Sequence, residues 1–370
     1  MKVTPDAELP LVQRFPDLAL RLRREPLCGL PTPVTRAPGL ERAVDCGPLW
    51  IKSDGASAQP YGGSKPRKLE WILGRIRARG IRRIVTSGGL GTNHGLATAL
   101  YARQLGVACE LILVPQPLDE RVRLRILQLV ASGATIHACS SALAGVARGA
   151  RCLLRPPRAV LIPTGGSSAL GALGLVNAGL ELAAQVDAGV LPEPARLYVA
   201  LGSGGTAAGL AAGLSLAGLR TRVVAICVSD FFAPGPRRLA YKARRALRLV
   251  TREASARRAG ATLRLEVDRR FLGAGYGSPT AEGERAGELA GDLTGLRLEP
   301  TYTSKALAAL FARERGVRDP LLFWNTHASS EPDLALPDWR ALPGALQRFF
   351  REPAAPDEPC STSACAQPDP

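Results

Sequence analysis

Apolar and polar positions between residues 71 and 228 form a regular alternation of two kinds of segment. Stretches with helical apolar spacing are separated by short, mostly apolar runs that are typical of buried strands. The pattern predicts helices over 71–80, 93–105, 119–131, 141–154, 168–185 and 205–219, and strands over 81–86, 108–114, 134–138, 159–162, 196–201 and 221–228. Helices that alternate with strands through short links favour parallel sheets covered by helices, which is an α/β fold.

The alternation falls into two successive series, the first ending near residue 162 and the second beginning near residue 168. Each series predicts one α/β unit, and a cleft between two such units, at the carboxyl ends of the strands, is a favoured place for a ligand. We expect residues 346–370 to be a disordered tail. From residue 352 onward this segment is rich in Pro, Ala and acidic residues and shows no periodicity.

The composition, with 46% hydrophobic and 22% charged residues, is that of a globular protein and excludes a mostly disordered chain. The net charge of +16 comes almost entirely from arginine. Aromatic residues make up only 5% and the arginines are scattered, apart from a basic run at 237–258, so we expect no nucleic-acid partner. A solvated basic surface is the expected interpretation, with attraction of anionic substrates or membrane surfaces as the alternative.

The eight cysteines form no CxxC pair and no zinc-like spacing, so we expect no metal site. The first residues, MKVTPDAELP, contain no apolar segment of a secretory signal. Residues 197–219 lack charges, but their glycines favour a strand, a loop and a buried helix over a membrane span. We therefore expect a cytoplasmic protein without a membrane partner.

The first candidate for chemistry is Lys65 in the segment YGGSKPRKLE (61–70). Pro66 favours the first turn of a helix, which places Lys65 just before the helix that we expect to begin at Pro66. The positive end of the helix dipole disfavours the ammonium form, and a neutral, positioned amine is what Schiff-base chemistry requires. The alternative is a solvated lysine that happens to precede a helix.

Two glycine-rich loops follow predicted strands and open predicted helices. The loop TSGGLGTNHG (86–95) places Thr92, Asn93 and His94 at a helix N-terminus, where they either face a ligand or, in the case of Thr92 or Asn93, only cap the helix. The loop LGSGGTAAG (201–209) offers backbone donors to a phosphate. It matches neither a Walker loop nor a dinucleotide fingerprint, so a single phosphate suits it best.

Six motifs occur in the order YGGSKPRKLE, TSGGLGTNHG, IPTGGSSALGALG, LGSGGTAAGL, GYGSPTAEG and EPTYTSKA. Together they resemble the D-cysteine desulfhydrase and 1-aminocyclopropane-1-carboxylate (ACC) deaminase family of pyridoxal-phosphate enzymes, over about residues 30–342. The resemblance implies the tryptophan-synthase-β-like fold (fold type II), with two doubly wound domains of mainly parallel sheets, and a homodimer. Residues 1–67 and 161–345 would form the larger, cofactor-binding domain and residues 68–160 the smaller one.

The resemblance also assigns the cofactor site. It implies that pyridoxal 5'-phosphate is held covalently by Lys65, whose released amine then removes the Cα proton of an amino-acid substrate. Asn93 would contact the ring hydroxyl of the cofactor, and Thr303 would lie beside its pyridine nitrogen. The phosphate would lie against Gly202, Ser203, Gly204, Gly205 and Thr206.

The substrate side would be lined by Thr92, His94, Tyr276 and Tyr302, of which Thr92, Tyr276 and Tyr302 join Lys65 as candidate catalytic residues. The sequence departs from the family motifs at three places. Ser64 replaces the asparagine before the lysine, Thr92 replaces a serine, and Asn325-Thr326-His327-Ala328 stands where the family has an HTGG-like signature. Glycines there permit close backbone approach, so His327 and Ala328 are expected to narrow or reshape the pocket.

Thr303 stands where the deaminases of the family carry glutamate and the desulfhydrases carry threonine. A hydroxyl leaves the pyridine nitrogen largely neutral, which favours rapid loss of a β-leaving group over ring opening. The expected function is therefore a lyase or deaminase that eliminates the β-group of D-cysteine or a similar small amino acid to give a 2-oxo acid and ammonia. The alternatives are ring-opening deamination, racemisation or β-replacement in an altered pocket, and a protein without turnover that carries the cofactor or binds through its basic surface.

Overall fold

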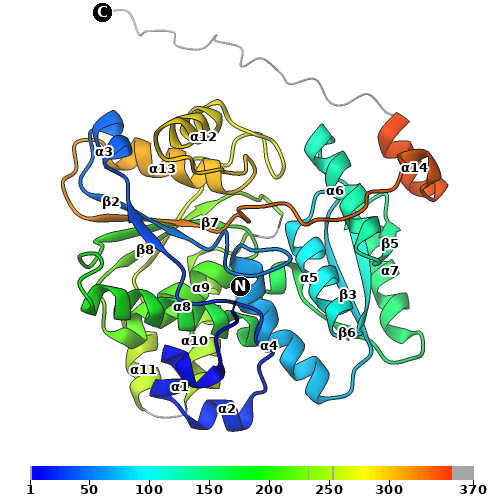
Figure 1. Cartoon of the computed structure of the whole chain (residues 1–370), viewed down its shortest axis with the longest axis horizontal. Helices are drawn as coiled ribbons and strands as arrows, with labels where there is room; N and C mark the ends of the chain where they lie inside the picture. The colour runs from blue at the N-terminus through cyan, green and yellow to red at the C-terminus, as the bar shows by residue number, and fades with distance from the viewer. Residues whose placement is uncertain (1, 232, 252–253, 352–370) are drawn as a thin grey trace, which may run out of the picture.

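The computed structural model describes residues 2–231, 233–251 and 254–351, with side chains given outside 254–257 in the last range. Two separate sheets organise the chain, and Figure 1 shows them side by side, each with its own helices. The six-stranded sheet has the order β1-β2-β10-β7-β8-β9 and the four-stranded sheet the order β5-β4-β3-β6. All neighbouring strands are parallel except the pair β1–β2.

The larger sheet consists of β1 (Val34–Arg36), β2 (Leu49–Ser53), β7 (Arg196–Leu201), β8 (Arg222–Cys227), β9 (Leu265–Asp268) and β10 (Leu321–Asn325). The smaller sheet consists of β3 (Arg83–Gly89), β4 (Ala108–Val114), β5 (Thr135–Ala138) and β6 (Val160–Leu161). The predicted strands between residues 81 and 228 are all present, with ends shifted by a few residues. The sequence analysis did not predict β1, β2, β9 and β10.

The helices are α1 (Pro10–Arg14), α2 (Asp17–Arg21), α3 (Pro38–Val44), α4 (Ser64–Ala78), α5 (Asn93–Gln104), α6 (Glu120–Ala131), α7 (Ala142–Leu154), α8 (Ala169–Asp187), α9 (Gly205–Ala217), α10 (Pro236–Val250), α11 (Ala254–Ala261), α12 (Ala281–Thr294), α13 (Thr303–Glu314) and α14 (Gly344–Arg351). The chargeless stretch 197–219 forms most of β7, a loop and the buried helix α9, as predicted. Within the described ranges, α8 is the one helix with the length and apolar composition of a membrane span, and most of it is buried in the protein.

The predicted C-terminal tail begins too early. Residues 344–351 form α14, whose Leu346 and Phe349 are buried against the core of the smaller sheet. Arg123 of α6 donates from Nε to the Phe349 carbonyl oxygen at 3.1 Å. The apolar face of this short amphipathic helix is buried, and composition alone does not indicate such a face. Residues 352–370 lie outside the described residues. Segments far from 68–160, including Leu27 and Ala58, also join this smaller core.

A close approach of α4 and α8 fixes the helix that carries Lys65. The contact depends on Gly174 of α8, because a Cβ atom there would overlap the backbone carbonyl oxygen of Arg67 in α4. A Cβ atom on Gly171 of α8 would likewise overlap the Gly166 carbonyl oxygen. Two glycines on one helix therefore let its backbone contact two segments of the pocket region.

We predict that Gly174→Ala lowers the free energy of unfolding by about 1–3 kcal/mol, because the new methyl group overpacks the contact between α4 and α8. The matched control is Gly291→Ala in α12, where no atom lies within 4 Å of the added Cβ. That change raises stability by up to about 1 kcal/mol through helix propensity. Equilibrium urea unfolding measures both, and equal effects of the two substitutions would contradict the packing argument.

Candidate active site

A pocket lies at the carboxyl ends of β3, β7 and β10 and holds about 870 Å³ of empty space, its open mouth included. It gathers residues from both sheets, as expected for a ligand site at strand ends in α/β proteins. Of the predicted site residues, those that line it are Lys65, Thr92, Asn93, His94, Gly202, Ser203, Gly204, Thr206, Tyr276, Tyr302 and Thr303. Gly205 is buried and is not one of the lining residues.

Lys65 lies inside the first turn of α4 and not before it, because the helix begins at Ser64. Gly63 makes this earlier start possible: its φ of +81° favours glycine, and a Cβ there would lie 2.7 Å from the Thr326 carbonyl oxygen. Pro66 then occupies the third helical position. The first four N–H groups of a helix have no intrahelical acceptor, so the N–H that proline lacks removes no hydrogen bond within the helix. The predicted start at Pro66 is therefore wrong by two residues, although Lys65 still lies at the N-terminal end of the helix.

The amine of Lys65 faces the pocket without a hydrogen-bond or ion-pair partner among the described residues. Enclosure by protein lowers the pKa of Lys65, and the carboxylates of Glu299 and Asp54 raise it in part. Burial also lowers the pKa of the neighbouring Lys68 far below its usual value, with a further lowering by the charges of Lys65 and Lys242. Both amines are therefore shifted toward the neutral form that nucleophilic chemistry needs.

The loop before α9 forms a cradle for an anionic group. Gly204 is the N-cap of α9, has φ +89° and provides no side-chain cap, so the helix N-terminus opens toward the pocket. Gly205 donates its N–H to Ser167 Oγ at 3.0 Å, and a Cβ there would lie 2.6 Å from that oxygen. Ser167 Oγ also lies 2.6 Å from Ser203 Oγ, which joins the loop 201–209 to the segment before α8. Backbone donors, a helix N-terminus and the nearby Lys68 fit a bound phosphate group.

The N-terminus of α5 presents Thr92 and Asn93. Thr92 Oγ1 accepts the Gly95 N–H at 3.0 Å, so the hydroxyl caps the helix and its own hydrogen remains to be donated toward the pocket. Asn93 Oδ1 accepts a hydrogen bond from the Tyr61 hydroxyl at 3.1 Å, which leaves the amide NH₂ as a donor. Tyr61 is one of the pocket residues that the sequence analysis missed.

His94 is engaged by protein at both ring nitrogens. The Thr86 hydroxyl donates its hydrogen to the Ile162 carbonyl oxygen at 2.8 Å. Because that hydrogen is used, Thr86 Oγ1 accepts the imidazole N–H from His94 Nε2, which lies 3.0 Å away. Nδ1 then accepts from the Thr98 hydroxyl at 3.3 Å. Burial, with the charges of Lys65 and Lys68, lowers the pKa of His94 far below its usual value. The geometry therefore favours a neutral, structural imidazole over the predicted substrate contact.

Tyr276 and Tyr302 also line the pocket. Tyr302 donates its hydroxyl to Tyr276 Oη at 3.0 Å, and the rings meet edge to face with centroids 5.9 Å apart. Burial raises the pKa of Tyr276 to about 12, less a small lowering from the hydrogen bond with Tyr302. Burial and the neighbouring Tyr276 raise the pKa of Tyr302 as well. Both phenols are therefore protonated at neutral pH and can act as proton donors.

Thr303 begins α13 and binds the backbone of Glu299. Its hydroxyl oxygen accepts the Glu299 N–H at 2.8 Å and donates to the Glu299 carbonyl at 3.2 Å. The Glu299 carboxylate lines the pocket and accepts the N–H groups of Thr301 and Tyr302. Glu299 was missed as a site residue although it opens the motif EPTYTSKA, because nothing local to the sequence shows which way its side chain points.

The departures from the family motifs also lie at the pocket. Ser64 Oγ is buried without a hydrogen-bond partner among the described residues, and it lines the cavity next to Lys65. His327 and Ala328 line the wall beside Gly63, so the side chains that replace the glycines do occupy this wall. Burial lowers the pKa of His327; Glu299 and Glu331 raise it in part, and Arg125 and Arg297 lower it further. His327 therefore faces the pocket mainly as a neutral imidazole.

A family model of pyridoxal-phosphate-dependent enzymes matches residues 27–324 of the chain. The chain belongs to this family of enzymes. Pyridoxal phosphate is its cofactor, which agrees with the donor set of the glycine-rich loop and with the amine of Lys65 in the pocket. The predicted family, α/β fold class and cofactor are thereby confirmed.

Relatives of known name cover most of the chain. Nocardicin C-9' epimerase from Nocardia uniformis subsp. tsuyamanensis is 33% identical over 84% of this chain and 94% of its own length. D-cysteine desulfhydrase from Klebsiella pneumoniae (strain 342) is 32% identical over 83% and 94%. Among solved structures, an ACC deaminase homologue matches with a TM-score of 0.73 at 26% identity over 87% of this chain and 95% of that one. A pyridoxal 5'-phosphate-dependent aspartate racemase, at 14% identity and a TM-score of 0.58, shares the fold.

We predict that the rate at which the apoenzyme incorporates the cofactor declines at a lower pH in Glu299→Gln than in the parent enzyme. Glu299 raises the pKa of Lys65, so its neutralisation lowers that pKa further, and the neutral amine that bonds to the cofactor persists to lower pH. Stopped-flow absorbance measures the incorporation rate against pH. Glu331→Gln is the matched control, a carboxylate near His327 that does not act on Lys65. An unshifted or oppositely shifted decline in Glu299→Gln would show that Glu299 does not act on Lys65.

Proposed function

We propose that this enzyme catalyses β-elimination on a small amino acid of the D-cysteine type and releases a 2-oxo acid, ammonia and the leaving group. The observation that carries the proposal is that the amine of Lys65, whose pKa is lowered, shares one pocket with a protonated tyrosine pair and with Thr303. The similarity to D-cysteine desulfhydrase supports the same reaction.

The residues present would hold the cofactor at three places. The loop 202–206, through N–H groups other than that of Gly205, and the Lys68 side chain would bind the phosphate. Asn93 would bind the ring hydroxyl, and Thr303 would lie beside the pyridine nitrogen with its hydroxyl hydrogen held by the Glu299 carbonyl. Lys65 would provide the covalent attachment. When bound, the cofactor supplies electron withdrawal from the bonds to the substrate Cα.

The chain's own groups would then move the protons. Lys65 Nζ accepts the proton from the substrate Cα, which its lowered pKa permits near neutral pH. The Thr92 hydroxyl donates a hydrogen bond to the substrate carboxylate. The Tyr276–Tyr302 pair keeps its protons at neutral pH and donates one to the leaving group as it departs. His327 and Ala328 limit the size of the substrate at the remaining wall.

We predict that D-cysteine changes the visible absorbance of the purified, cofactor-loaded enzyme and is converted to pyruvate and sulfide. Lys65→Ala is expected to lower the rate of this conversion by about 10²–10⁴-fold, because the base is lost. Arg75→Ala on the exposed face of the same helix is the control and leaves the rate unchanged. L-cysteine and ACC test the stereochemistry and the ring-opening alternative. Unchanged turnover in Lys65→Ala would refute the proposed role of Lys65.

Epimerisation is the second candidate, because the relative at 33% identity is named an epimerase. Both reactions begin with removal of the Cα proton, and they differ in whether a β-group leaves or a proton returns. Incubation with D-amino acids in deuterium oxide separates the two. Deuterium at Cα with formation of the L-isomer and without 2-oxo acid would favour epimerisation.

We predict that Thr303→Glu changes the absorbance of the bound cofactor and slows β-elimination, because a carboxylate would keep the pyridine nitrogen protonated. Thr303→Ser, which keeps the hydroxyl that binds the Glu299 backbone, is the control and leaves both properties close to those of the parent enzyme. A spectrum and rate untouched by Thr303→Glu would place Thr303 away from that nitrogen.

We also propose that the enzyme is a cytoplasmic homodimer. The six cysteines in the described part of the chain are all unpaired, which is typical of a reducing compartment. Leu143, Val146 and Leu154 on α7 are exposed apolar side chains of the kind that a subunit interface covers. The family resemblance supports the dimer as well.

A further inference from the structure

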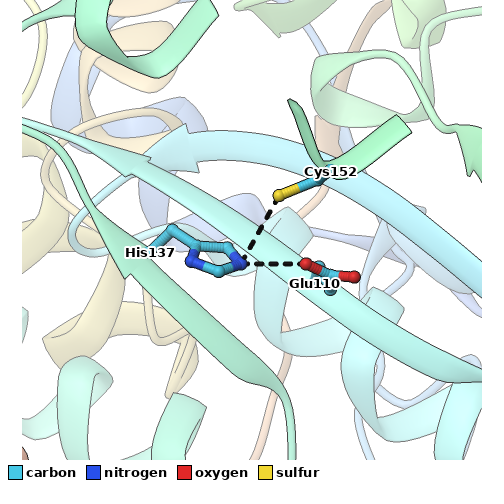
Figure 2. Close-up of side chains that lie close together, drawn as sticks. All are labelled: Glu110, His137 and Cys152. Carbon is cyan, nitrogen blue, oxygen red and sulfur yellow. Dashed lines mark hydrogen bonds and ion pairs between the residues drawn. The ribbon is translucent and has the colours of Figure 1, made fainter. Parts of the chain in front are cut away.

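Three side chains that can bind a metal ion converge in the smaller domain, away from the cofactor pocket. Glu110 comes from β4, His137 from β5 and Cys152 from the end of α7, and Figure 2 shows all three side chains directed at one point. His137 Nε2 lies 2.9 Å from Glu110 Oε2 and 3.6 Å from Cys152 Sγ. All three candidate ligand atoms lie within 4.8 Å of one another.

Strand geometry places this cluster on the outer face of the smaller sheet. Ile112 of β4 is the register partner of His137, and Glu110 lies two residues before Ile112, so all three share one face. Ile112 and Cys152 belong to the small apolar cluster beneath α7. Leu111 and Leu113 point to the opposite face, into the core that includes α5, whose N-terminus lines the cofactor pocket.

The cluster is not arranged as a nucleophilic triad. In such a triad the base binds the nucleophile through one ring nitrogen and the acid through the other. Here His137 uses the same nitrogen, Nε2, toward both Glu110 and Cys152. The Nε2 proton of His137 and the thiol proton of Cys152 both serve the Glu110 carboxylate, and one cation between the three ligand atoms would replace both protons.

The carboxylate of Glu110 is oriented for such a cation. Its Oε1 accepts hydrogen bonds from Arg83 and Arg155, while Oε2 points to His137. Outer hydrogen bonds of this kind fix the orientation of metal-binding carboxylates. Arg83 also donates to the Cys152 carbonyl at 2.8 Å and so positions the end of α7.

We propose that Glu110, His137 and Cys152 form a binding site for a divalent zinc ion, with water as the fourth ligand. A thiolate, an imidazole and a carboxylate are the ligand types that zinc takes, with bonds of about 2.0–2.3 Å that place neighbouring ligand atoms roughly 3–4 Å apart. The side chain of His137 is 18% exposed, which gives the ion and its water access from solvent. Binding releases the Cys152 thiol proton to solvent and leaves the imidazole proton on Nδ1.

This site was not expected from the sequence. Its ligands lie 27 and 15 residues apart along the chain and show no short metal-binding spacing. Parallel pairing of β4 with β5 and the packing of α7 bring them together. The site is independent of the proposed reaction, so the two can fail separately.

The test measures zinc binding to the full-length, cofactor-loaded enzyme without a histidine tag, after chelator treatment under reducing conditions. Isothermal titration is expected to give one zinc ion per chain for the parent enzyme. Cys152→Ser and His137→Asn are each expected to weaken binding more than about 10-fold. Cys139→Ser is the matched control, a half-buried thiol of the same apolar cluster outside the ligand set, and keeps the parent affinity.

Two further measurements keep the outcome clear if a variant folds poorly. Cobalt in place of zinc is expected to show tetrahedral and thiolate absorbance bands in the parent enzyme and in Cys139→Ser, and to lose the thiolate band in Cys152→Ser. Added zinc is expected to raise the thermal unfolding midpoint of the parent enzyme and of Cys139→Ser but not that of Cys152→Ser, because zinc binds the folded state of the first two proteins. Absence of stoichiometric zinc in the parent enzyme, or equal binding by Cys152→Ser and Cys139→Ser, would overturn the proposal.

Discussion

A buried network of charged side chains beneath the pocket holds the Lys65 segment in place. Arg67, two residues after Lys65, lies 2.9 Å from both Asp54 Oδ1 and Glu181 Oε2, and Lys52 Nζ lies 2.7 Å from Glu181 Oε1. All four side chains are at most 3% exposed. Burial alone would raise the pKa of Glu181, but Arg67 and Lys52 lower it to about 2. Removal of one partner from such a buried network leaves an uncompensated charge and costs about 3–5 kcal/mol.

The network joins the three segments that shape the lysine side of the pocket. Asp54 donates its N–H to the Asn325 carbonyl at 3.0 Å, accepts the Gly63 N–H at 2.8 Å through its own carbonyl, and binds Trp324 Nε1 through Oδ2 at 2.9 Å. Through these bonds β2, the start of α4 and the end of β10 keep one relative position. Glu181 adds α8, whose Gly174 contacts the Arg67 carbonyl. The position of the Lys65 amine is therefore set by buried charge and by backbone contact together.

The sequence predicted the parts of this enzyme that depend on local pattern or on motif. The helix–strand alternation between residues 71 and 228 and the glycine-rich loops at 86–95 and 201–209 have local causes, and both loops line the pocket. The strand β10 between β2 and β7, by contrast, depends on pairing between residues far apart in the chain, which no local signal reveals. The same is true of the place of Glu299 in the pocket and of the cluster of Glu110, His137 and Cys152 on three elements.

The central claim is that Lys65, among the lysines near the pocket, bonds covalently to the cofactor. Borohydride reduction of the loaded enzyme makes the bond between lysine and cofactor permanent, and peptide mass mapping then identifies the modified residue. The account predicts the modification on Lys65 alone, because its amine faces the pocket without a described partner, whereas Lys68, Lys242 and Lys305 each donate to a backbone carbonyl. Modification of Lys68, or of any lysine other than Lys65, would contradict it.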